Sequence, residues 1–152
     1  MVTAHVAPFF SVPPHVECPV GPLYVWFTEP PGVVLQLMEA VRFTTEIARW
    51  LIGPGLDLLA QRYDEATRFT IVFDIRQMTG RDPVVRSLFM DLAREQAGRF
   101  EAIVAIPPLQ INPVYLAGLH AAAALVSAFG PRFEISGDVA HVIYRHRLRP
   151  AG

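Results

Sequence analysis

The sequence has no lysine and few charged side chains of any kind. All 13 basic residues are arginine, charged residues make up 18% of the 152 residues, and the formal net charge is −1. A general nucleic-acid-binding protein normally carries a clear basic excess, because neutralising phosphates drives its affinity. We therefore expect no nucleic-acid partner.

Cysteine is almost absent as well. Cys18 is the single thiol, which excludes an intrachain disulfide and a cysteine-rich zinc site. The residues around it include no clear activating partner, so we expect a buried thiol rather than a nucleophile. The histidines lack metal-binding spacing, no serine lies in a Gly-x-Ser-x-Gly elbow, and there is no Gly-x-Gly-x-x-Gly or phosphate-binding loop. The sequence predicts no metal, no cofactor and no enzyme activity.

No apolar run is long enough to cross a bilayer. The longest, residues 116–129, is interrupted by His120 and is too short, and the first residues lack the positively charged start of a signal peptide. We expect no transmembrane segment and a cytoplasmic location. Hydrophobic residues nevertheless make up 52% of the chain, so we also expect apolar surface to be buried in a homodimer.

The order of hydrophobic patterns predicts one α/β domain preceded by an arm. Residues 1–22 contain Pro8, Pro13, Pro14, Pro19 and Pro22, which predicts an irregular arm, docked through two phenylalanines at positions 9 and 10. Residues 23–152 are predicted to form a single domain. The expected strands are 23–27, 33–43, 69–75, 100–106 and 133–135, and the expected helices begin near 44, 82, 112 and 138, the first interrupted at 53–55.

Strands that alternate with helices favour a mostly parallel sheet of four to five strands, with an N-terminal β-hairpin and helices packed on it. One alternative stays open at the end of the chain. Residues 138–148 suit a helix, but Val142, Ile143 and Tyr144 would also suit a strand.

A strand, a short loop and a helix form the most distinctive stretch. The strand is Ile71-Val72-Phe73-Asp74-Ile75, the loop is Met78-Thr79-Gly80-Arg81-Asp82-Pro83, and a further strand and the long helix from Asn112 follow. Over residues 23–148 this order resembles the STAS domain of bacterial anti-sigma-factor antagonists and their SEC14-like relatives.

The resemblance implies a domain that binds partner proteins and is not an enzyme. Many such antagonists are switched by phosphorylation of a serine at the start of the helix after the central strand. Here that position reads Arg81-Asp82-Pro83-Val84, so the resemblance implies that the phosphoacceptor is missing. Thr79 and Ser87 are nearby hydroxyls that do not occupy the matching position.

The loop between 74 and 86 is the best candidate for binding a ligand or partner, because ligands of open α/β sheets gather beyond the carboxyl ends of the strands. Its arginines suit a phosphate or carboxylate. Asp82 is expected to cap the following helix and Asp74 to pair with an arginine, so structural ion pairing is the favoured interpretation. The candidates are Asp74, Arg76, Thr79, Arg81, Asp82 and Arg86.

The helix predicted after Asn112 is rich in alanine and glycine. We favour the interpretation that it packs tightly on its own sheet. The alternative that its small side chains contact a helix of a partner stays open.

The sequence leaves two hypotheses for the function. The first is a regulatory or scaffold domain that acts through protein contacts without the phosphoacceptor serine, and the second is a carrier or sensor of a small or lipid-like molecule. A flat apolar face bearing Phe9, Phe10 or Trp26 would favour the first, and a pocket between the arm and residues 107–112 would favour the second.

Overall fold

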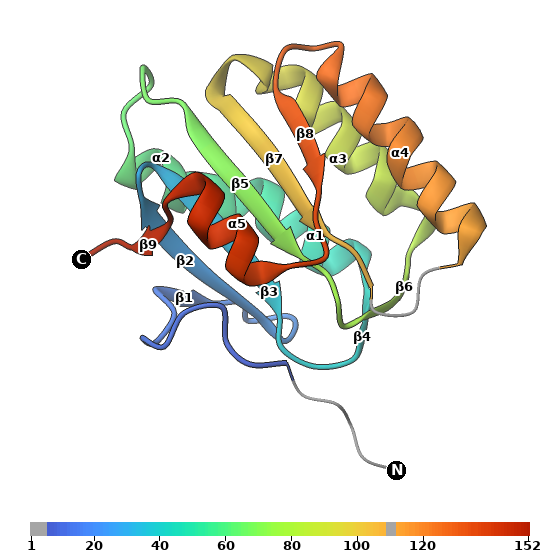
Figure 1. The fold of residues 1–152 in the computed structure, drawn as a ribbon, viewed down its shortest axis with the longest axis horizontal. Coiled ribbons are helices and arrows are strands. Elements are labelled where there is room, and N and C mark those ends of the chain that lie inside the picture. Colours follow the sequence, from blue (N-terminus) through green and yellow to red (C-terminus); the bar gives the residue numbers. More distant parts are fainter. Residues whose placement is uncertain (1–5, 109–111) are drawn as a thin grey trace.

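The computed structural model describes residues 6–108 and 112–152 and shows a mixed sheet with helices on both faces (Figure 1). Within these residues seven strands form the main sheet. In spatial order they are β1 (Val16–Glu17), β2 (Leu23–Glu29), β3 (Gly32–Leu37), β5 (Phe69–Asp74), β7 (Phe100–Ile106) and β8 (Arg132–Ile135), with β9 (Arg149–Pro150) also beside β2. The run from β3 to β8 is parallel, and β1, β2 and β9 are antiparallel additions at one edge.

The predicted α/β class with a mostly parallel sheet is confirmed. The sheet has more strands than the predicted four to five, because β1 lies in the arm that was expected to be irregular and β9 follows the last helix. Each is only two residues long. Such short strands carry no hydrophobic period in the sequence and form because the free edge of β2 offers backbone partners.

The second predicted strand, 33–43, is wrong in its extent. Leu37 is the partner of Leu23, the first residue of β2, and β3 ends there, with one further backbone bond from the Met38 amide to the Pro22 carbonyl at 2.8 Å. The chain then forms a separate strand β4 (Val41–Phe43), which pairs in parallel with β6 (Met78–Arg81) as a two-stranded sheet. The segment expected to be a loop before the second helix therefore contains a strand.

The helices follow the predicted starts. The first helix consists of α1 (Thr45–Trp50), a π-helical turn η1 (Leu51–Gly55) and α2 (Leu56–Arg62). The backbone keeps helical φ and ψ angles at both junctions. Pro54 lies inside the π-helical turn, where its missing amide and its ring are accommodated by the wider helix. The predicted interruption is thus a change of helix type.

The other helices are α3 (Pro83–Glu95), α4 (Pro113–Ser127) and α5 (Val139–His146), with a short 3₁₀ turn η2 (Ala97–Arg99) after α3. Both α3 and α4 start with proline in the first helical position, where its fixed φ suits the helix. The open alternative for residues 138–148 is settled as helix α5, whose first turn is capped by the Asp138 carboxylate accepting from the His141 amide at 3.3 Å.

Alternate residues of the strands supply two separate cores, because successive side chains point to opposite faces of a sheet. Val25 and Phe27 face the side covered by α1 to α4. Trp26, which is 0% exposed, faces the side covered by α5 and the arm. In Figure 1 α5 crosses in front of the strands, and α1 and α2 lie behind them.

The arm does dock through its phenylalanines. Phe9 and Phe10 are buried against each other and against Trp26, with edge-on ring contacts of 5.0 and 5.8 Å. The indole Nε1 of Trp26 donates to the carbonyl of Val12 at 3.1 Å. The arm therefore completes the second core. The division into an arm (1–22) and a domain (23–152) stays a prediction, and residues 1–5 of that arm lie outside the described residues.

Candidate functional site

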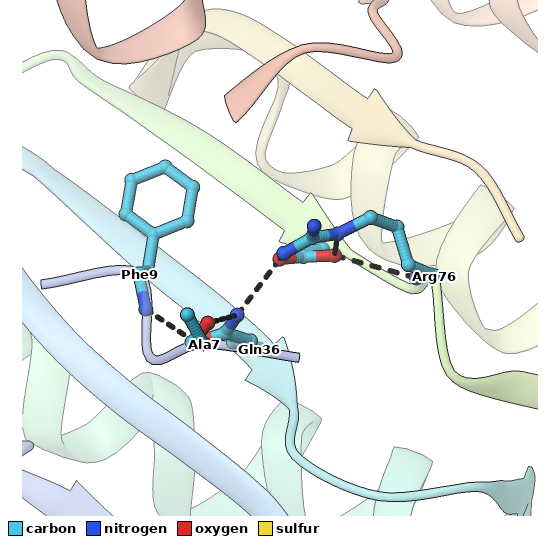
Figure 2. A network of polar contacts seen from close by, with 5 residues as sticks. Ala7, Phe9, Gln36 and Arg76 are labelled. Carbon is cyan, nitrogen blue, oxygen red and sulfur yellow. Dashed lines mark hydrogen bonds and ion pairs between the residues drawn. The ribbon is translucent and has the colours of Figure 1, made fainter. Parts of the chain in front are cut away.

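The end of β5 holds a buried polar network that ties the arm to the sheet (Figure 2). The Asp74 carboxylate is fully buried and accepts from Arg76 Nε at 2.9 Å and Nη2 at 2.7 Å. The hydrogen bonds with Asp74 raise the pKa of the Arg76 guanidinium. The two residues satisfy each other, as the favoured interpretation of ion pairing expected.

Gln36, at the end of β3, connects this pair to the arm. Its Nε2 donates to Asp74 Oδ2 and to the carbonyl of Ala7, both at 3.0 Å, and its Oε1 accepts from the Phe9 amide at 2.7 Å. Both amide hydrogens are thereby used. In Figure 2 the Gln36 side chain lies between the arm and Arg76. The network has a structural role and leaves neither Asp74 nor Gln36 open to a ligand.

Asp82 was expected to cap its own helix, and this prediction is wrong. The side chain makes no capping bond to α3. Its Oδ2 instead accepts from the Thr45 amide at 2.7 Å at the start of α1, and its Oδ1 accepts from Arg42 Nε at 2.8 Å. The pairing of β4 with β6 places Phe43 opposite Arg81 and so brings the start of α1 within reach of this carboxylate. The Asp82 carboxylate thus connects β4 and the start of α1 to the loop before α3.

The Asp82→Asn variant is expected to lose stability at neutral pH and to be less sensitive to acid than the wild type. The hydrogen bond from Arg42, followed by those from Thr45, holds the pKa of the Asp82 carboxyl below its ordinary value of 3.8. A lowered carboxyl pKa contributes stability that is present above the unfolded value and is lost as the pH falls through the folded one. The difference in unfolding free energy between wild type and variant should therefore shrink below pH 3.8.

Urea titrations of both proteins from neutral to acidic pH measure this difference. The matched control is Asp57→Asn, which removes an exposed carboxylate of α2 that has no ion pair within the described residues. A difference between wild type and Asp82→Asn that stays constant across the acid range would contradict the role of this carboxylate.

A cavity of about 670 Å³ lies between α3, α4 and the sheet; we call it the α3–α4 cavity. Cavities that bind small molecules typically measure about 300–1,000 Å³ and are mostly apolar. In Figure 1 α3 and α4 run side by side at one end of the sheet. The side chains that line it are mainly apolar, among them Phe43, Ile71, Phe73, Val85, Phe89, Met90, Ile103, Leu119, Val126 and Phe133.

Helix α4 roofs this cavity rather than packing tightly on the sheet, so the favoured interpretation of its small residues is wrong. Of its residues only Val126 is buried. Gly118 and Ala122, one helical turn apart, line the cavity. A Cβ added at Gly118 would meet no atom within 4 Å. The small side chains leave space beneath the helix.

The polar residues of the cavity come from the starts of its two helices and from β6. Arg81, Arg86, Asn112 and Tyr115 are its polar or charged lining residues, and no Asp or Glu lines it within the part of the chain that the structure describes. Asn112 is occupied, since its Oδ1 accepts from the Tyr115 amide at 2.7 Å and caps α4. These segments meet because α3 and α4 both begin near the carboxyl ends of parallel strands.

The two arginines at this end of the cavity have no acidic partner. Arg81 is half-buried and Arg86 is exposed, and among the described residues neither has a carboxylate oxygen within 4.0 Å. Burial raises the pKa of the Tyr115 phenol, and the charge and hydrogen bonding of Arg81 oppose that rise. The Tyr115 hydroxyl is therefore neutral near pH 7 and able to donate a hydrogen bond.

The remaining sequence candidates lie away from the cavity. Thr79 is exposed on β6, and the exposed Ser87 hydroxyl donates to the Val84 carbonyl at 2.9 Å. Burial raises the pKa of the Cys18 thiol.

Across residues 6–108 and 112–152 there is no group of three or more potential metal ligands. None of the helices described there is both long and apolar enough to span a bilayer.

Of the six predicted site residues, the structure brings only Arg81 and Arg86 to the cavity. Sequence reasoning missed the contribution of α4 and β7, which lie far along the chain. One signal was present: residues 113–127 contain no charged side chain, which is unusual for a helix covered on one face only.

A parallel core with an antiparallel edge, covered by α1 to α4 on one face and by α5 on the other, is a SpoIIAA-like, STAS-like fold. The chain is similar to the crystal structure, at 2.25 Å resolution, of an uncharacterized protein from the DUF3478 family with a SpoIIAA-like fold from Shewanella loihica PV-4. The TM-score is 0.56 at 12% sequence identity, over 81% of this chain and 90% of that chain.

This likeness confirms the resemblance to the STAS fold that the sequence indicated, and it bears on the fold alone. No family model matches the sequence, and a search of curated proteins gives no match.

Proposed function

We propose that this protein is a non-catalytic binding protein that holds a small apolar molecule in the α3–α4 cavity. The observation that carries the proposal is the cavity itself, about 670 Å³ in volume and lined mainly by apolar side chains. Protein interiors are normally packed as densely as organic crystals. Side chains around an unfilled space lose dispersion contacts on one side, and an apolar ligand restores them.

The flat apolar face that would have favoured a protein-docking domain is not formed by the residues expected on it. That face was expected to bear Phe9, Phe10 or Trp26, and all three are buried in the second core. The pocket expected for a carrier was placed between the arm and residues 107–112. Asn112 does line the α3–α4 cavity, whereas none of the described arm residues, 6–22, does. Residues 109–111 lie outside the described residues. A carrier or sensor is therefore the better supported of the two functions.

A regulatory role fits the same site, with ligand binding in place of phosphorylation as the signal, because the position of the phosphoacceptor serine is taken by Arg81-Asp82-Pro83-Val84. The expected protein partner and homodimer stay predictions.

Filling part of the cavity is expected to weaken the binding of an apolar ligand. The test uses the neutral dye Nile red, whose fluorescence rises in apolar surroundings, with the Ala122→Leu variant. The larger side chain takes space that the ligand needs, and the loss of two buried methylene equivalents, at about 0.8 kcal/mol each, weakens binding about tenfold.

Ala121→Leu is the matched control. Ala121 precedes Ala122 on the same helix, is exposed and does not line the cavity, so this variant should bind the dye as the wild type does. Equal dye affinity in both variants, or no saturable binding to the wild type, would refute the carrier proposal.

A further inference from the structure

The charged side chains that line the α3–α4 cavity are all positive among the described residues. Arg81 and Arg86 are its charged lining residues, with no carboxylate among the described residues that line it. The two carboxylates of the loop between 74 and 86 pair with other arginines: Asp74 with Arg76 at 2.7 Å, and Asp82 with Arg42 of β4 at 2.8 Å. Neither carboxylate is therefore paired with Arg81 or Arg86, and the polar end of an otherwise apolar cavity carries positive charge alone, which suits an anionic group.

Of the two arginines, Arg81 is the one that an anionic ligand would stabilise more. It is half-buried, and a guanidinium is charged at every physiological pH. Removing a charge from water without a counter-ion is costly. A planar oxyanion that accepts two parallel N–H bonds offsets the cost and suits the guanidinium geometry. The Tyr115 hydroxyl beside it supplies one more donor to the same oxyanion.

We propose that the ligand of this cavity is a single-chain amphiphile with a carboxylate head group, whose chain lies among the apolar side chains and whose carboxylate binds Arg81 and the Tyr115 hydroxyl. This inference rests on the proposed function. A volume of about 670 Å³ is that of a site for one ligand of drug size, which favours a single acyl chain. Arg86 adds a second positive charge at the solvent side.

The experiment is displacement of Nile red from the full chain by four amphiphiles that each have one linear chain of twelve carbon atoms: dodecanoate, dodecanol, dodecyltrimethylammonium and dodecyl phosphate. A hydrogen bond to a charged group contributes about 1.5–3 kcal/mol, so dodecanoate should bind about tenfold to a hundredfold more tightly than dodecanol. The cationic amphiphile should bind most weakly. A ranking of dodecyl phosphate above dodecanoate would overturn the carboxylate head group and assign a phosphate instead.

Arg81→Gln should reduce the affinity for dodecanoate to that for dodecanol and leave the dodecanol affinity unchanged. Arg49→Gln is the matched control, because Arg49 is exposed on α1, has no ion pair within the described part of the chain and does not line the cavity. Tyr115→Phe provides a second variant that keeps the ring, and it should weaken dodecanoate several-fold with no effect on dodecanol.

The chain itself is tested with shorter carboxylates. From octanoate to decanoate to dodecanoate, each added methylene should tighten binding about fourfold, because burying one contributes about 0.8 kcal/mol. An affinity independent of chain length would overturn the placement of the chain in the cavity.

The two proposals fail in different ways. If Nile red binds and Ala122→Leu weakens its binding, but dodecanol competes as well as dodecanoate in the wild type, the head-group inference is wrong and the carrier function stands. If no dye binds to the wild type, the carrier function fails first.

Discussion

Replacing Asp74 with alanine is expected to lower the free energy of unfolding by about 3–5 kcal/mol, the usual cost of breaking a buried ion pair by removing one partner. Asp74 is 0% exposed, and its carboxylate accepts three side-chain hydrogen bonds, two from Arg76 and one from Gln36. Without it the half-buried Arg76 guanidinium and one buried amide hydrogen of Gln36 lose their partner. Urea denaturation followed by circular dichroism measures the change.

A double variant separates the loss of the pair from the loss of volume. In Asp74→Leu/Arg76→Met both charges are gone, and replacing a whole buried pair by apolar residues is often neutral. The double variant should therefore be more stable than Asp74→Ala. An Asp74→Ala protein as stable as the wild type would show that the pair is dispensable, contrary to its complete burial.

Deleting residues 1–14 is expected to destabilise the protein by about 3–6 kcal/mol. The deletion removes Phe9 and Phe10 from the second core, and burial of each large apolar side chain contributes about 1.5–3 kcal/mol. Gln36 also loses the Ala7 and Phe9 partners of its amide. Trp26 becomes accessible to water, so the tryptophan emission should shift to longer wavelength along with the loss of stability.

The exchange Ser11→Ala, at an exposed position of the arm, is the control and should leave stability unchanged. The deletion also tests where the domain begins. A truncated protein that unfolds at the wild-type urea concentration would show that residues 1–14 are an appendage to a domain that folds without them. A large loss would make the arm part of the domain.

Signals confined to neighbouring residues were sufficient for the helices, the central strands and the fold class. The apolar run from 69 to 75 indicated a covered central strand, and β5 (Phe69–Asp74) lies between β3 and β7. Asp82-Pro83 and Asn112-Pro113 marked the starts of α3 and α4. These predictions hold because φ restriction and the local hydrophobic period act over a few residues and do not depend on distant parts of the chain.

Contacts between distant segments decided the rest. The pairing of β4 with β6 moved the Asp82 carboxylate from its own helix to the start of α1, and the arm supplied a partner for Gln36, 27 residues away from Phe9. Neither partnership leaves a trace in the sequence around the residues concerned.

The candidate site was likewise predictable in its residue types but not in its position or shape. The residue types at 81 and 86 were sufficient to predict an anion-binding capacity, which is a property of the guanidinium itself. Whether each arginine is paired depends on which carboxylates the fold brings near it, and the cavity depends on how far α4 stands from the sheet. Both are set by the packing of elements far apart in the chain, so the sequence predicted the charge of the site, and its position and shape follow from the three-dimensional arrangement.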